Sequence, residues 1–206
     1  AFLFGNTSKP PQRHRKETRM ASFNEIVSET LGIEGDWSDH PSDSGGKTMF
    51  GITEGVAREY GYTGPMKDLP VHLAKQIYRE RYWNVMRLDE VLSIAPAIVG
   101  ELFDTGVNQG TGRAGEYLQL ALNALNRQQK DYDDIKVDGD IGPGTLHALN
   151  IYRTKRDRRG DVVMLRALNC LQGSFYITLS QRREKDEDFV FGWLFNRVVV
   201  FIILDM

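Results

Sequence analysis

Near the start of the chain, apolar residues recur every three to four positions. This spacing is that of one face of an amphipathic helix. The recurring residues are Phe23, Ile26, Val27, Thr30 and Leu31. The preceding Ser22-Phe23-Asn24-Glu25 has the capping-box pattern that begins helices. A helix from Ser22 toward Leu31 is therefore expected, and the polar, glycine-containing residues 41–46 after it predict a turn.

The rest of the chain carries further helical patterns, separated by residues that end helices. A polar break over 128–140 divides these patterns. We expect helices from Thr53 to Tyr60, from Pro70 to Trp83, from Ser93 through Phe103, over 113–127, over 143–152 and, with Asp161 as the cap, toward Arg183. Strand and helix patterns do not alternate, which argues against a parallel sheet. The predicted fold class is mainly α (α+β), with one small β hairpin in the first half.

Glu34 continues the apolar face of the first helix, since it lies three positions after Leu31 and seven after Val27. Burial there would disfavour the charged form and raise the pKa of this carboxyl, which suits a general acid. Asp43 lies nine positions further on in the polar turn, where its carboxylate is expected to stay hydrated. Two carboxyl groups in different environments are the equipment for hydrolysing a glycosidic bond. Spacing alone still favours a helix-terminal Glu and a turn-forming Asp, because both are common.

The segment that holds these two carboxyl groups resembles a known family motif. Residues 34–53 read Glu-Gly-x-x-Ser-Asp-x-Pro-x-Asp-x-Gly-Gly-x-Thr-x-x-Gly-Ile-Thr, and they closely resemble the opening motif of glycoside hydrolase family 108. Later motifs of the same family resemble the segments 77–83, 103–108, 118–122, 137–146 and 191–197. The resemblance thus covers about residues 20–198.

The resemblance implies a phage- or prophage-type N-acetylmuramidase with a lysozyme-like fold, built of two lobes with a small β hairpin beside the catalytic helix. It implies a catalytic lobe over 20–110 and a helical lobe over 111–198 that resembles a peptidoglycan-binding region. Residues 1–19 would then be a non-native or disordered extension, and 199–206 a tail. The chain departs from many members at Asp36-Trp37, where they have Gly-Tyr, and at Ser44, where proline is usual.

The same resemblance makes Glu34 the catalytic acid that protonates the leaving oxygen. Analogy to phage-type lysozymes adds Asp43, which would orient water or stabilise the developing positive charge, and Thr48, which would help to hold that water. The distance between the two carboxyl groups in space would decide between inverting and retaining outcomes.

Three further residues are candidates for substrate binding. Trp37 is the preferred sugar-stacking residue, because it lies within the catalytic loop. Asp104 and Asn108 are four positions apart on one helix face. They would either hydrogen-bond the glycan or tie the two lobes together.

The predicted function is hydrolysis of the β-1,4 bond between N-acetylmuramic acid and N-acetylglucosamine in peptidoglycan. One alternative is a lytic transglycosylase, which uses a single acid/base and against which Asp43 argues. The other is a non-enzymatic protein that binds the cell wall or assists secretion, which the intact pair of Glu34 and Asp43 disfavours.

Composition narrows the class of protein without naming a function. With 206 residues, 41% hydrophobic and 26% charged, the chain has the composition of an ordinary globular protein. A formal net charge of -2 does not indicate nucleic-acid binding. A basic cluster over 153–159 reads as a solvated turn or as attraction to anionic wall polymers.

The remaining signals concern metals, cysteine and location. No histidine or cysteine cluster has metal-ligand spacing, so neither metal nor cofactor is expected. Cys170, the single cysteine, is expected to be a buried and inert thiol. The apolar start at 1–4 is too short for a signal peptide, and 198–204 is too short to cross a bilayer. We expect a monomer without membrane insertion that is made in the bacterial cytoplasm and acts on the wall, with a holin-type release partner if it is phage-derived.

Overall fold

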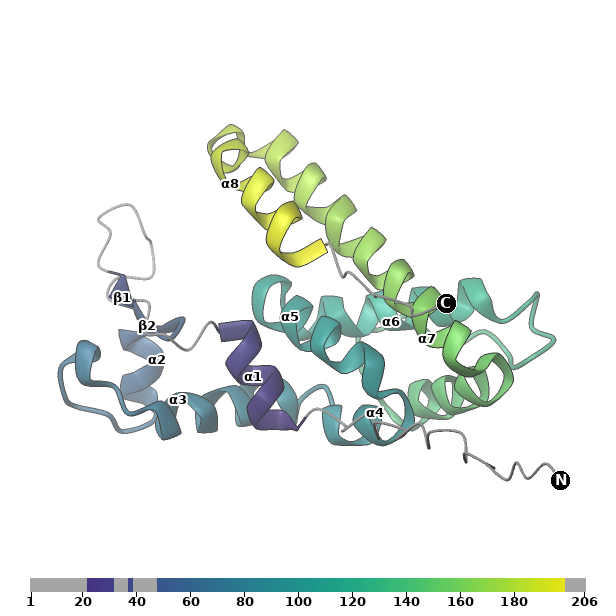
Figure 1. Cartoon of the computed structure of the whole chain (residues 1–206), viewed down its shortest axis with the longest axis horizontal. Coiled ribbons are helices and arrows are strands. Elements are labelled where there is room, and N and C mark those ends of the chain that lie inside the picture. Colours follow the sequence, from purple (N-terminus) through teal and green to yellow (C-terminus); the bar gives the residue numbers. More distant parts are fainter. Residues whose placement is uncertain (1–21, 32–36, 39–47, 199–206) are drawn as a thin grey trace, which may run out of the picture.

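The protein is mostly helical, with one small antiparallel sheet near the start of the chain (Figure 1). The computed structural model describes residues 22–31, 37–38 and 48–198, and for 29–31 and 37–38 it describes the backbone. The predicted catalytic residues Glu34 and Asp43 therefore lie outside the described residues. The mainly α fold class expected from the sequence is confirmed.

The first helix, α1 (Phe23–Leu31), begins at the predicted capping box. The backbone N–H of Ser22 donates to Glu25 Oε2 over 2.7 Å, and the N–H of Glu25 donates to Ser22 Oγ over 3.4 Å. Both bonds satisfy N–H groups at the helix start that have no carbonyl partner within the helix. The sequence prediction for this helix is confirmed.

The sheet has three antiparallel strands in the order β1-β2-β3: β1 (Trp37–Ser38), β2 (Thr48–Met49) and β3 (Ile52–Thr53). Phe50 and Gly51 connect β2 to β3 with φ values of 52° and 71°. Positive φ at both central residues is the geometry of the two-residue turn that matches the natural twist of a hairpin. The predicted hairpin is thus present and gains a third short strand.

Three helical segments follow the sheet. The helix α2 (Glu54–Glu59) starts at the predicted cap, where Thr53 Oγ1 accepts a hydrogen bond from the N–H of Val56 over 3.4 Å. A 3-10 turn, η1 (Met66–Asp68), leads to α3 (Val71–Tyr78), which continues without a break into the π-helical turn η2 (Arg79–Trp83). The segment expected to be one helix up to Trp83 is therefore helical throughout.

The next region corrects one expectation. Ser93 was expected to begin a helix, but it lies in the last turn of α4 (Leu88–Ile94), and its hydroxyl donates to the carbonyl of Glu90 over 2.7 Å. Because Leu88 and Val91 are completely buried, tertiary packing stabilises this short helix. A 3-10 turn, η3 (Pro96–Ile98), then leads into the central helix α5, and α6 follows it; their bounds are Val99–Gln109 and Thr111–Leu125.

A long loop over 126–142 separates α6 from the last long helix. Gln119 of α6 fastens this loop: its Oε1 accepts the N–H groups of Asp138 and Gly139 over 2.9 and 2.8 Å, and its Nε2 donates to the carbonyl of Asp140 over 2.8 Å. The backbones touch here, because a Cβ on Gly115 would lie 2.0 Å from the carbonyl oxygen of Gly139. The predicted polar break is therefore an ordered loop packed against α6.

The helix α7 (Pro143–Arg182) is one long element with a kink at Asp157, where φ is 52° and ψ is -148°. The sequence predicted a helix over 143–152 and a second one capped by Asp161. The cap assignment is wrong, because the helix continues past 152, breaks at Asp157 and contains Asp161. The Asp161 carboxylate instead forms an ion pair with Arg153 Nε over 2.7 Å.

The chain then turns back along α7. It forms a 3-10 turn, η4 (Glu184–Asp186), the helix α8 (Glu187–Trp193) and the π-helical turn η5 (Leu194–Val198). Figure 1 shows α8 lying beside the second part of α7, and together they project beyond the other helices. Gly173 allows this approach, since a Cβ there would lie 3.2 Å from Val198 Cγ1.

One hydrophobic core runs from α1 to α7. Its largest fully buried side chains include Tyr78, Trp83, Phe103, Leu118 and Leu149. By length and composition alone, α7 is also long and apolar enough to cross a membrane. The central helix of a globular core passes the same test, and α7 contributes several residues to this core.

Candidate functional site

Thr48 and the backbone of Trp37 are the parts of the predicted catalytic loop that the structure describes. Thr48 is half-buried in β2, between Ser38 of β1 and Thr53 of β3. Trp37 lies opposite Met49 in the same sheet. The structure thus brings Thr48 next to the strand that carries Trp37.

The turn of this sheet is fastened to the helical core by Tyr78. The Tyr78 hydroxyl, at the end of α3, donates to the carbonyl of Phe50 over 2.9 Å in a buried position. A Cβ on Gly51 would lie 2.6 Å from the same hydroxyl oxygen, so only glycine fits there. Burial raises the pKa of Tyr78, so it remains a neutral hydrogen-bond donor. The turn next to the strand that carries Thr48 is therefore bonded to a core residue of α3.

Aromatic side chains continue this support toward α1 and α5. Tyr78 packs edge-on against Phe103 of α5, with ring centroids 6.0 Å apart. Trp83 is fully buried and meets Phe23 of α1 edge-on at 4.9 Å. The guanidinium of Arg79 lies 4.8 Å from the Phe23 ring centroid. Trp83 is thus part of the core that joins α1, η2 and α5.

Asp104 lies on α5 and is surrounded by hydrogen-bond donors. The side chains of Asn108, Gln172 and Arg197 all donate to its carboxylate: Asn108 Nδ2 over 3.0 Å, Gln172 Nε2 over 2.8 Å and Arg197 Nη1 over 2.5 Å. These contacts connect α5 to α7 and η5. Of the two roles considered for Asp104 and Asn108, the observed contacts are those of a structural tie. Their role in binding the glycan stays a prediction.

Sequence reasoning did not identify Gln172 or Arg197 as partners of Asp104. Gln172 is completely buried on α7, and Arg197 lies in η5. Arg197 belongs to the closing motif at 191–197, so a signal for it was present in the sequence. Nothing in the sequence indicated that Asp104 is its partner, because 93 positions separate the two residues.

Glu101, one turn before Asp104 on α5, is a third residue that sequence reasoning missed. It is only 7% exposed, and burial, followed by the charge of Asp104, raises the pKa of its carboxyl to about 8. Hydrogen bonding to Thr105 and Asn169 lowers the pKa in part. Glu101 is therefore protonated at neutral pH, and its Oε1 has no hydrogen-bond partner among the described residues.

Two further sequence expectations concern metal ligands and the single cysteine. Within 22–31, 37–38 and 48–198, the structure contains no group of three His, Cys, Asp or Glu residues that could hold a metal ion. Cys170 was expected to be buried, but it is exposed on α7. The error arises because the buried face of α7 passes through Leu168, Asn169 and Gln172 instead.

Comparison with family models identifies both halves of the chain. The Glycosyl hydrolase 108 model matches residues 27–110, and the Predicted Peptidoglycan domain model matches residues 113–198. The chain carries a glycosyl hydrolase 108 domain followed by a predicted peptidoglycan domain. With these two domains, the protein is a glycoside hydrolase that acts on peptidoglycan.

A solved structure shares this architecture. It is described as the structure of Brucella abortus SagA, and it superposes with a TM-score of 0.52 over 82% of this chain and 94% of the SagA chain. The two sequences are 23% identical, so the likeness concerns the fold. No curated protein matches the chain.

The domain division shows that several contacts of Asp104 cross from one domain to the other. Asp104 and Asn108 belong to the glycosyl hydrolase domain, whereas Gln172 and Arg197 belong to the peptidoglycan domain. The carboxylate of Asp104 therefore joins the two domains through an ion pair and a hydrogen bond. Gln109 adds a weaker link, since its Nε2 donates to the carbonyl of Gln172 over 3.4 Å.

Proposed function

We propose that the protein is an N-acetylmuramidase that hydrolyses the β-1,4 bond between N-acetylmuramic acid and N-acetylglucosamine. Glu34 is the general acid, Asp43 stabilises the positive charge or activates the water, and Thr48 helps to hold that water. Trp37 offers a stacking surface to a sugar ring. The motif over 34–53 within a matched glycosyl hydrolase 108 domain is the observation that carries this proposal.

The reaction moves one proton from the enzyme to the leaving oxygen, and the enzyme later regains one when water attacks. Glu34 donates its proton to the glycosidic oxygen while the bond from that oxygen to the anomeric carbon breaks. The sugar acquires oxocarbenium-like charge, which the Asp43 carboxylate stabilises. Water then forms the new bond to the anomeric carbon and loses a proton, Glu34 regains one, and the product has a reducing end.

The described part of the site supports this proposal by fixing the sheet. Thr48 sits in the central strand, and the adjoining turn is bonded to Tyr78 in the core. A catalytic group must be held close to its productive position, and support from a packed helix restricts it more than a free loop would. The aromatic contacts of Phe23 and Trp83 anchor α1, the helix that precedes Glu34 in the sequence.

The test is the variant Glu34→Gln, which keeps the shape of the side chain and removes the proton. We expect release of reducing ends from purified peptidoglycan to fall at least about a hundredfold, because general acid catalysis supplies that much. Glu116→Gln removes an exposed carboxylate of α6 and should leave the rate unchanged. Circular dichroism would verify that both variants are folded.

Two outcomes would contradict the proposal. A Glu34→Gln variant that clears peptidoglycan at nearly the rate of the unaltered protein would remove Glu34 as the acid. Products with a 1,6-anhydro end, detected by mass spectrometry, would show a lytic transglycosylase in place of a hydrolase.

A further inference from the structure

The kink of α7 borders a basic pocket in the peptidoglycan domain. The pocket has a volume of about 330 Å³ and is lined by the charged groups of Lys155, Arg156 and Arg159, with Leu125 and Val163 among its apolar walls. No acidic side chain of the described residues lines it. A concave site that combines apolar walls with a few convergent charges has the form of a ligand site.

The backbone beside this pocket is strained. Asp157 is not glycine, yet it has a φ of 52° and a ψ of -148°. Its Oδ1 accepts the N–H of Arg159 over 2.9 Å, which holds the kink. Gly160 packs so closely that a Cβ there would lie 2.4 Å from Arg156 Cβ. Strained residues of this kind persist where the surroundings force them, and they gather at functional sites.

The positive charge of the pocket is only partly balanced by its neighbours. The closest shared acid is Asp131, and Arg127 already binds it with two hydrogen bonds. Lys155 Nζ and Arg156 Nη2 lie further from the same carboxylate, at 3.3 and 3.6 Å. Arg159 is 92% exposed in its side chain, and its Nε lies 3.7 Å from Asp157 Oδ1. The pocket therefore favours an anionic ligand.

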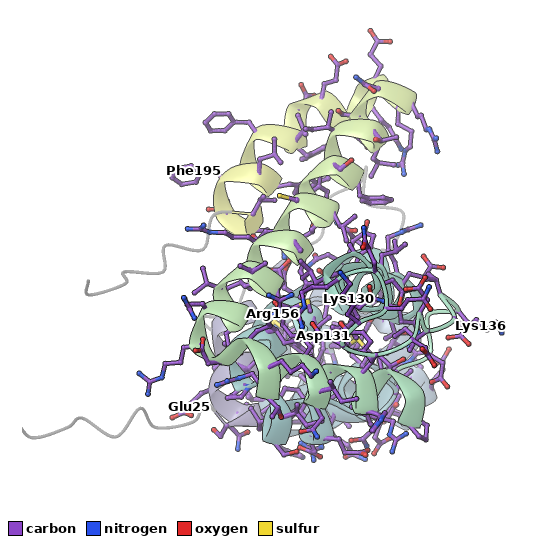
Figure 2. The ribbon with its side chains drawn as sticks, turned by 90° about the vertical axis from the view of Figure 1, so that its right-hand side faces the viewer. Glu25, Lys130, Asp131, Lys136, Arg156 and Phe195 are labelled. Atoms are coloured by element: carbon purple, nitrogen blue, oxygen red, sulfur yellow. The ribbon has the colours of Figure 1, made fainter. Side chains whose placement is uncertain are left out.

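A neighbouring pocket limits what that anion can be. This second pocket, of about 480 Å³, is lined by Asp131, Asp133 and Asp134 together with Lys130 and His147. Asp131 lines the second pocket and forms ion pairs with Lys155 and Arg156, which line the first. Figure 2 shows Arg156, Asp131 and Lys130 close together on one face of the molecule. A polyanion laid across both pockets would be repelled by the aspartates, whereas a ligand that bears a carboxylate and an ammonium group fits both.

We propose that this paired site binds the stem peptide of peptidoglycan. A carboxylate of the peptide lies in the basic pocket between Lys155 and Arg159, and a free amino group faces the exposed Asp133 and Asp134 of the second pocket. The proposal rests on peptidoglycan being the substrate, and it adds that the second domain recognises the peptide part while the first cleaves the glycan.

The experiment measures binding of a free stem tetrapeptide, which contains a diamino acid and no sugar, to the full chain by calorimetry. The double variant Lys155→Gln, Arg159→Gln should bind at least roughly tenfold more weakly, because it loses two charge-assisted contacts to the carboxylate of the peptide. The matched control Arg158→Gln, Arg166→Gln removes two exposed positive charges of α7 that do not line the pocket. It should bind like the unaltered protein.

One further variant and three outcomes could contradict the proposal. Arg159→Gln alone changes a fully solvated side chain and should weaken binding without affecting the fold. Unchanged binding in the double variant, equal loss in the control, or tighter binding of polyphosphate than of the peptide would each overturn the proposal. Since the peptide has no glycosidic bond, its binding is independent of catalysis. The double variant should therefore still cleave glycan strands stripped of peptides, which separates this proposal from the proposed muramidase activity.

Discussion

Two completely buried glutamines of this protein differ in how completely their side-chain amides are hydrogen-bonded. Gln119 of α6 is 1% exposed and makes hydrogen bonds with both ends of its amide, two of them to backbone N–H groups of the loop over 126–142. Gln172 of α7 is 0% exposed. Its Nε2 donates to Asp104 and Thr105, but its Oε1 has no partner among the described residues.

The neighbours of the two glutamines differ in the same way. Around Gln119, the backbones of Gly115 and Gly139 touch, so the loop has a single arrangement. Around Gln172, polar atoms of Glu101, Asn169 and Tyr176 are also without a hydrogen-bond partner in the described part of the chain. A satisfied buried network stabilises one structure, whereas an incompletely satisfied one does not. By this criterion, hydrogen bonds specify the loop inside the peptidoglycan domain more completely than the polar cluster at the joint between the domains.

The largest expected effect is that of Gln119→Leu. The change leaves the N–H groups of Asp138 and Gly139 without their partner, whereas the carbonyl of Asp140 keeps the hydroxyl of Thr145. We expect the free energy of unfolding to fall by roughly 2–6 kcal/mol, because each unpaired group costs about 1–3 kcal/mol. Denaturant titration would measure it. A loss below about 1 kcal/mol would show that the loop does not depend on this side chain.

Glu101→Gln should have an intermediate effect that depends on pH. The pKa of Glu101 is raised from 4.5 to about 8, so between these pH values the folded protein holds a proton that the unfolded chain has released. Stability is therefore highest below the lower value and falls as the pH rises, by about 3 kcal/mol between about pH 5 and pH 8. The variant lacks this dependence, so it should be more stable than the unaltered protein at pH 8.

Denaturant titrations across this pH range would measure the difference. Glu116→Gln, at an exposed position of α6, serves as the control and should retain the decline. Parallel pH profiles for the Glu101→Gln variant and the unaltered protein would show that Glu101 is not the titrating group.

The smallest effect is expected for Gln172→Leu. The variant loses two hydrogen bonds but also removes an unpaired buried oxygen, and Asp104 keeps Asn108 and Arg197 as partners. The free energy of unfolding should change by less than about 1 kcal/mol. A loss comparable to that of Gln119→Leu would erase the contrast between the two sites.

Local signals in the sequence were sufficient for several elements. The capping box of Ser22 and Glu25 and the helix start at Thr53 both act within a few residues, and the structure contains both. The family resemblance, drawn from ordered motifs, was confirmed by both domain matches.

Features that depend on distant partners could not be read in the same way. The helix α4 forms because Leu88 and Val91 are buried by other elements. The kink lies at Asp157, where no glycine or proline marks it. The exposed Cys170 shows that an apolar neighbourhood in the sequence does not fix which face of a helix is covered. Among the site residues, Glu34 and Asp43 lie outside the described residues, so their roles rest on the motif.

The ion pair between Asp104 and Arg197 has a consequence for the order of assembly. A ribosome releases the chain from its first residue onward, and domains fold as units in that order. Since 93 positions separate the two partners, the first domain is synthesised in full well before Arg197 emerges. The junction is therefore completed only after Arg197 has emerged, and a nascent chain that stalls before this arginine would lack the ion pair between the two domains.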